Sequence, residues 1–121
     1  MALPNPGDSP VLLHNPRCSK SRAAKTLLEE RSVPFEVRAY LEDPLAADEL
    51  QELARRLKRP PSEWTRTKEA AFAEAGLRAD AASEAWIAAI AAHPILMERP
   101  ILVRGGSAAI GRPPEDILEL L

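Results

Sequence analysis

The chain has little of what forms disulfide bonds, binds zinc or crosses membranes. Of its 121 residues only one, Cys18, is a cysteine, and no apolar run approaches the length of a membrane span. A single thiol cannot form an intramolecular disulfide, and histidine and cysteine do not recur at the spacing of zinc ligands. We therefore expect no bound metal and no bound cofactor. Any redox cycle at Cys18 has to take its second thiol from another molecule.

Strong net charge is also missing. The chain has 16 basic and 18 acidic residues and a formal net charge of -2, whereas general nucleic-acid and membrane-surface binders carry basic clusters or a clear positive balance. We therefore expect neither nucleic acid nor membrane as a partner. The opening residues 1–8 lack the charged and apolar regions of a signal peptide, so the cytoplasm is the expected compartment.

Length and composition fit one domain. A chain of 121 residues, 45% of them hydrophobic, can bury about two-thirds of the surface that its unfolded form exposes. Repeats, low-complexity tracts and long linkers are not found in the sequence. The expected organisation is a single domain over residues 1–121, with a flexible tail at 1–10.

The first 41 residues have the pattern of a β-α-β unit with parallel strands. Residues 11–14 are a short apolar run, which predicts a buried strand, and apolar residues at helical spacing then predict a helix that ends near 29–31. A second strand is predicted from the alternation of residue types over 35–41. In this alternation Phe35, Val37, Ala39 and Leu41 share one face, and Glu36, Arg38 and Tyr40 share the other.

The middle of the chain, about residues 44–94, predicts a helical insertion. One helix follows Pro44 and stops at Pro60. A second runs from Lys68 to Ala75, before Gly76, and a third is capped by Ser83 and carries Trp86 on its buried face.

The closing section returns to strands. Residues 101–104 and 107–110 predict a hairpin around Gly105-Gly106, and a last helix begins at Pro113-Pro114. That helix is expected to bury Ile117, Leu118 and Leu121. Without the helical middle, the element order β-α-β, β-β-α is that of a thioredoxin- or glutaredoxin-like α/β sheet.

Cys18 has the sequence context of a reactive thiol. It lies between the end of a predicted strand and the start of a predicted helix, where the helix dipole and the free N–H groups of the first turn favour the thiolate. No acidic residue occurs between Asp8 and Glu29, while Arg17, Lys20, Arg22 and Lys25 supply positive charge. His14 could add positive charge, and Ser19 or Ser21 could cap the helix or donate a hydrogen bond to the thiolate. The segment therefore predicts a nucleophile beside an anion site.

Three arginines outside this segment stand at turns rather than on a regular polar helix face. Arg99 precedes Pro100, where a cis peptide bond is possible, Arg112 lies between Gly111 and Pro113, and Arg66 lies in the middle segment. Most arginines are solvated surface charges, and this chain has twelve. If these three converge, their guanidinium groups would suit a tetrahedral oxyanion.

Four separated segments resemble the glutaredoxin-dependent arsenate reductase family, in the same order and with similar spacing. The resemblance extends from about residue 11 to residue 121. The segments are HNPRCSKSR at 14–22, RTKE at 66–69, HPILMERP at 93–100 and IGRPP at 110–114.

This resemblance implies a thioredoxin-like fold, an arsenate reductase activity and a set of site residues. It implies that Cys18 is the nucleophile, that His14 and Ser21 stabilise its thiolate, and that Pro100 is cis and packs opposite Cys18. It further implies that glutathione is the co-substrate and that glutaredoxin is the protein partner. The ligands of arsenate and arsenite, or of a similar small oxyanion, would be Arg66, Arg99 and Arg112.

Two other functions stay open from the residues. A glutathione-dependent thiol transferase would use Cys18 on mixed disulfides and would depend little on the three arginines. A regulatory protein with a thioredoxin fold would bind a protein partner such as RNA polymerase. Sensors of that kind often use a Cys-x-x-Cys pair, and the second position is Ser21 here, which weighs against sensing by a disulfide.

Overall fold

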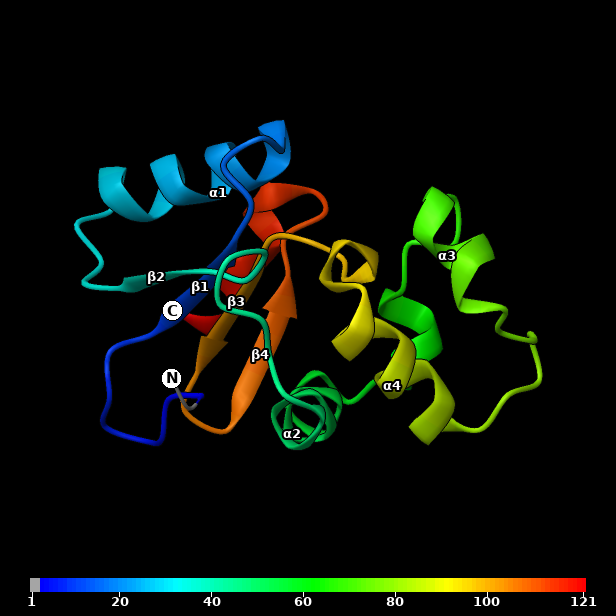
Figure 1. Ribbon diagram of the computed structural model, residues 1–121. Helices are drawn as coiled ribbons and strands as arrows, with labels where there is room; N and C mark the ends of the chain where they lie inside the picture. Colours follow the sequence, from blue (N-terminus) through cyan, green and yellow to red (C-terminus); the bar gives the residue numbers. More distant parts are fainter. Residues whose placement is uncertain (1–2) are drawn as a thin grey trace. The chain divides into compact units, whose positions relative to one another are not determined.

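The computed structural model describes residues 3–121, which form a mixed α/β structure (Figure 1). Contacts within the chain divide it into two compact units. The first contains the chain up to Asp43 together with Arg99–Leu121, and the second contains Pro44–Glu98. The first unit carries Cys18 and the sheet, and the second is helical.

The first unit is built on a four-stranded sheet with the order β2-β1-β3-β4. Its strands are β1 (Val11–His14), β2 (Glu36–Ala39), β3 (Ile101–Arg104) and β4 (Ser107–Ile110). β1 pairs with β2 in parallel and with β3 antiparallel, and β3 and β4 form an antiparallel hairpin. The predicted parallel β-α-β opening, the closing hairpin and the α/β class are confirmed.

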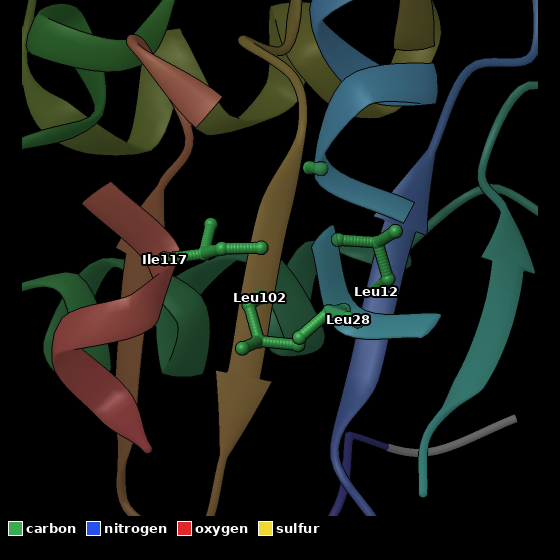
Figure 2. Close-up of a cluster of buried hydrophobic side chains, with 5 residues drawn as sticks. Leu12, Leu28, Leu102 and Ile117 are labelled. Atoms are coloured by element: carbon green, nitrogen blue, oxygen red, sulfur yellow. The ribbon is translucent and has the colours of Figure 1, made fainter. Parts of the chain in front are cut away.

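Two helices pack on one face of this sheet and enclose its core. Helix α1 (Ser19–Glu30) connects β1 to β2, and the 3₁₀ helix η3 (Pro114–Leu120) follows β4. Figure 2 shows side chains from β1 and β3 meeting side chains from α1 and η3. This apolar contact holds α1 against the sheet. The fully buried members are Leu12, Ala24, Leu28, Leu102 and Ile117.

Strand β2 does not bury one face of the predicted alternation and expose the other. Val37 is 39% exposed, whereas Arg38 is 3% exposed and Tyr40 is also buried. The Arg38 guanidinium is satisfied where it lies, since its Nε donates to the Asp43 carbonyl oxygen at 3.0 Å and lies 3.3 Å from Asp43 Oδ2. A buried arginine is tolerated once its polar head is paired. The strand is also shorter than the predicted 35–41.

The C-terminal helix starts where predicted but differs in type and in what it buries. It is a 3₁₀ helix, Ile117 is fully buried and Leu118 is half-buried, but Leu121 is 45% exposed. Residues three apart are eclipsed in a 3₁₀ helix, so Leu118 and Leu121 do not follow the α-helical stripe on which the prediction was based. The expected burial of Leu121 is therefore wrong.

The second unit contains the helical middle that the sequence predicted. Trp86, expected in a core, is buried and stacks on Phe72 with ring centroids 5.8 Å apart. Trp64 is also fully buried. The elements are α2 (Ala47–Leu57), η1 (Pro61–Trp64), α3 (Ala70–Ala75), α4 (Ser83–Ala92) and η2 (Pro94–Leu96).

The helix ends predicted for the second unit agree with the structure at Gly76 and differ from it in two places. Helix α3 ends at Gly76, whose φ of 64° is the left-handed conformation that favours glycine. It begins at Ala70 rather than Lys68. The cap of α4 is Ala82, and Ser83 is its first helical residue.

A flexible tail was expected at residues 1–10, and the first two of these lie outside the described residues. Within the described part, Leu3 is buried, and the Asn5 N–H donates to Asp8 Oδ2 at 2.8 Å. A buried side chain and a local hydrogen bond therefore hold part of this segment. None of the helices within residues 3–121 has the length and apolar character required to span a bilayer.

Candidate active site

Cys18 is the residue that caps the N-terminus of α1, immediately after a tight turn from β1. Its backbone is extended, with φ -98° and ψ 123°, and its N–H donates to the Asn15 carbonyl oxygen at 3.0 Å. The Asn15 side-chain oxygen accepts the Arg17 N–H at 3.0 Å, an Asx turn that shapes the loop. The Cys18 carbonyl oxygen accepts the Arg22 N–H at 3.0 Å and starts the helix. The thiol thus stands beside the unpaired N–H groups of the first turn.

The pKa of the Cys18 thiol is lowered from its ordinary value. Burial acts in the opposite direction and is the largest single influence, but four hydrogen bonds outweigh it. In decreasing order they come from the Ser21 N–H, the Arg99 side chain, the Lys20 N–H and the Arg112 side chain. The site therefore favours the thiolate, which is the nucleophilic form.

His14 and Ser21 fasten the end of β1 to the first turn of α1. His14 Nδ1 and Ser21 Oγ lie 2.7 Å apart in a buried hydrogen bond, and the Asn15 N–H donates to the same Oγ at 3.0 Å. The pKa of His14 is lowered by burial, and by the charges of Lys25 and Arg22, so the imidazole is neutral near pH 7. His14 therefore does not add the positive charge that the sequence suggested. The Ser21 hydroxyl links His14 to the Asn15 backbone, while the Ser21 backbone N–H helps to lower the pKa of the thiol.

Arg99 and Arg112 come from the far end of the chain to the thiol. Arg99 is buried just before β3 and Arg112 is half-buried just after β4, and both side chains help to lower the pKa of Cys18. Arg112 Nη1 donates to the Arg99 carbonyl oxygen at 2.8 Å, which links the two loops. The peptide bonds to Pro100 and to Pro113 are both cis. The first of these is the isomer that the resemblance implied.

Gly111 holds these two loops together and was not singled out from the sequence. Its N–H donates to the Pro100 carbonyl oxygen at 2.8 Å. A Cβ at this position would lie 2.7 Å from Pro100 Cγ and 3.1 Å from Ile117 Cγ2, so only glycine fits. In the sequence, the position of Gly111 directly before Arg112 was the feature that could have identified it.

The role of Asn15 was also missed from the sequence, although the Asn15-Pro16 pair indicated a turn.

Arg66 lies in the second unit, where two acidic side chains fix its guanidinium. Its Nε is 3.0 Å from Glu69 Oε1, and its Nη1 is 3.0 Å from Glu98 Oε1. Its backbone N–H donates to the Leu96 carbonyl oxygen at 2.6 Å. Of the seven predicted site residues, six lie in the first unit, and the part assigned to Arg66 stays a prediction.

The groups identified at the thiol are hydrogen-bond donors and arginine side chains. Among residues 3–121, histidine, cysteine and carboxylate side chains do not gather in groups of three that could hold a metal ion. The arrangement places a thiolate beside two guanidinium groups and two backbone N–H groups. Such a site can bind a small oxyanion and attack it with sulfur.

Comparison with known proteins places these features in one family. The ArsC family profile matches residues 13–120, nearly the whole chain. An arsenate reductase of Neisseria meningitidis is 44% identical over 112 residues, covering 91% of this chain and 96% of that protein. A protein of Escherichia coli strain K12, called uncharacterized protein YfgD, is 46% identical over 112 residues, covering 91% of this chain and 94% of its own length.

A solved structure shares the fold. The chain resembles the arsenate reductase from Vibrio cholerae with a TM-score of 0.89 and 42% sequence identity, covering 93% of this chain and 98% of that one. This likeness extends over both units, and it agrees with the fold that the order of predicted elements indicated.

Proposed function

Because the chain belongs to the ArsC family, we propose that it is an arsenate reductase in which Cys18 is the nucleophile. The observation that carries the proposal is the thiol itself, whose pKa is lowered by hydrogen bonds that include the Arg99 and Arg112 side chains. A site that stabilises a thiolate with guanidinium groups also neutralises an approaching oxyanion. Relatives that carry the name arsenate reductase support the choice of substrate.

The first chemical step joins sulfur to arsenic. Arsenate binds at the N-terminus of α1 with its oxygens on Arg99 and Arg112, and the Cys18 thiolate attacks the arsenic atom. A sulfur–arsenic bond forms, an arsenic–oxygen bond breaks, and hydroxide leaves. Arsenic is still pentavalent in this adduct. The two arginines stabilise the charge that accumulates on the oxygens during the attack.

The second step reduces arsenic and needs an external thiol, because Cys18 is the only cysteine. Glutathione attacks the Cys18 sulfur of the adduct as its thiolate. The electron pair of the sulfur–arsenic bond passes to arsenic, which leaves as arsenite, and the two sulfurs become a mixed disulfide. Glutaredoxin then attacks the glutathione sulfur and releases Cys18 as a thiolate. Two thiols are oxidised for each arsenate reduced.

The test is arsenate-dependent NADPH consumption with glutathione, glutaredoxin and glutathione reductase supplied. Cys18→Ser should abolish the signal, and Arg99→Ala should lower kcat/KM by about 10²- to 10³-fold, as expected when one donor to a developing oxyanion is lost. Arg78→Ala is the matched control, since Arg78 is an exposed arginine of the second unit. A folded native protein that gives no arsenate-dependent signal would contradict the proposal.

The same assay separates the remaining alternatives. The family resemblance assigns Arg66 as a third oxyanion ligand, and Arg66→Ala tests that assignment with Arg78→Ala as its control. A thiol transferase would turn over mixed disulfides equally well in the native protein and in Arg99→Ala. A regulatory protein would be inactive in both assays and would instead retain a protein partner on purification.

A further inference from the structure

Asn15 is a buried polar residue that the reaction proposed above does not use. The residue is 4% exposed. Its N–H donates to Ser21 Oγ, its carbonyl oxygen accepts the Cys18 N–H, and its side-chain Oδ1 accepts the Arg17 N–H, each at 3.0 Å. The backbone of Asn15 and its side-chain oxygen are therefore fixed in the turn that carries the thiol.

The remaining polar group of Asn15 is the side-chain amide nitrogen Nδ2, which has no hydrogen-bond partner among residues 3–121. This nitrogen carries two N–H donors, and buried donors in proteins are nearly always paired because an unpaired one costs free energy. Nδ2 is bonded to the same carbon as Oδ1, and Oδ1 accepts the N–H of the residue directly before Cys18. Two donors are thus held at the thiol-bearing turn for a partner from outside the chain.

The second asparagine of the chain provides a comparison. Asn5 and Asn15 are the only asparagines, and each precedes a proline. The turn after Asn5 is closed by backbone groups of Asn5, which donate to Asp8 Oδ2 at 2.8 Å and accept the Asp8 N–H at 3.0 Å. Asn5 is exposed, so water can satisfy its amide. Burial with an unpaired amide is therefore specific to the asparagine beside Cys18.

We propose that the Asn15 amide is an oxyanion ligand, with Nδ2 donating a hydrogen bond to an oxygen of the tetrahedral anion that binds at Cys18. The inference rests on the proposed function, to which it adds a catalytic residue. Arg99 and Arg112 supply positive charge, whereas an amide supplies a directed hydrogen bond without charge. The bond from Arg17 to Oδ1 orients the amide before the anion arrives, so little side-chain freedom is lost on binding.

Inorganic phosphate tests the proposal without any reduction of arsenic. Phosphate is a tetrahedral oxyanion like arsenate, and bound at Cys18 it should slow alkylation of the thiol by iodoacetamide, which is a neutral reagent. Because Cys18 is the only cysteine, the rate of alkylation reports this site alone. The fall in rate with rising phosphate, at constant ionic strength, gives the dissociation constant of phosphate. The same reaction without phosphate gives the pH midpoint of the thiol.

Asn15→Ser removes the amide and retains a hydroxyl that can accept the Arg17 N–H in a similar turn. We expect its dissociation constant for phosphate to rise about 10- to 100-fold, the loss expected for one hydrogen bond to a charged group. Its pH midpoint of alkylation should stay at the native value. Asn15→Asp keeps the shape and the accepting oxygen but replaces the donor with an acceptor, so it should weaken phosphate binding at least as much.

Asn5→Ser is the matched control, because it makes the same substitution at the exposed asparagine of the same unit. It should bind phosphate as the native protein does.

Three results would overturn the inference. Native-like phosphate binding by Asn15→Ser, or by the isosteric Asn15→Asp if the serine variant does not fold, would show that the amide is not a ligand. Weaker binding by Asn15→Ser together with a shifted pH midpoint would mean that Asn15 acts only by shaping the turn. A native protein that phosphate does not protect would have no oxyanion site at Cys18.

These outcomes are distinct from failure of the proposed function. Arsenate and glutathione take no part in the alkylation assay, so the role of Asn15 can be confirmed or rejected even if no arsenate-dependent NADPH consumption is found.

Discussion

At the scale of single residues, the reactivity of Cys18 depends on which groups donate hydrogen bonds that stabilise its thiolate. The sequence attributed the reactive thiol to the free N–H groups of the first helical turn and to nearby basic side chains. Two first-turn N–H groups do lower the pKa of the thiol, but the charged side chains that lower it are two arginines distant in sequence. The local basic residues are left exposed around it. His14 is neutral and acts through its hydrogen bond to Ser21. Local charge and thiolate stabilisation are thus separate properties of this site.

The lowered pKa of Cys18 predicts how its reactivity depends on pH. The rate of alkylation by iodoacetamide should follow the thiolate and reach half its maximum at a lower pH than the ordinary midpoint of a free cysteine. The same chain unfolded in urea is the control and should have its midpoint near that value. Coincident midpoints for folded and unfolded protein would contradict the hydrogen bonding described for the thiol.

The same shift links pH to stability. Between the folded pKa of Cys18 and its higher unfolded pKa, the unfolded chain binds more protons than the folded one, so the free energy of unfolding rises with pH in that window. This contribution is lost as the pH falls through the folded pKa. Urea unfolding under reducing conditions should show the rise in the native protein and not in Cys18→Ser.

At the scale of elements, the site is held by the contact between two loops. The loop before β3 carries Arg99 and Pro100, and the loop after β4 carries Gly111 and Arg112. The loops are joined by the hydrogen bond from the Gly111 N–H to the Pro100 carbonyl, by the bond from the Arg112 side chain to the Arg99 carbonyl, and by the close approach of Gly111 to the Pro100 ring. The hairpin of β3 and β4 places both loops at one end of the sheet, where β1 also ends. The long-range pairing of β1 with β3, and of β3 with β4, therefore brings both arginines to the end of the sheet that carries Cys18.

Gly111→Ala should disturb both loops. Its Cβ would overlap Pro100 Cγ, and neither the ring nor Ile117 is free to move away, so we expect a loss of about 1–3 kcal/mol in the free energy of unfolding, together with loss of arsenate reduction. Gly106→Ala is the control, because a Cβ there meets no atom within 4 Å and should change stability by less than about 0.5 kcal/mol. Equal stability of the two variants by urea unfolding would refute the packing argument.

At the scale of the whole molecule, the chain divides into a sheet unit and a helical unit. The sheet unit is discontinuous, since its last two strands follow the helical segment Pro44–Glu98. Its core joins β1 and α1 from the start of the chain to β3 and η3 from the end. Hydrophobic burial between distant parts of the chain is therefore what completes the unit that carries Cys18.

Core side chains and terminal side chains of the same type should differ sharply in their effect on stability. Leu102 is fully buried between Leu28 and Ile117, whereas Leu121 is exposed (Figure 2). Leu102→Ala should lower the free energy of unfolding by about 2–5 kcal/mol. Leu121→Ala should change it by less than about 0.5 kcal/mol. A large effect of Leu121→Ala in urea unfolding would restore the original expectation that it is buried.

The sequence by itself determined the order of elements and the position of Cys18 before a helix, because periodicity, prolines and glycines act through the backbone geometry of a few neighbouring residues. The tertiary structure decided what depends on distant partners. Arg38 of β2 is buried where it pairs with Asp43, and Leu121, which follows the 3₁₀ helix, is exposed. Arg99 and Arg112 contact the thiol only because the sheet joins both ends of the chain. Such contacts require long loops to close, and no local pattern records them.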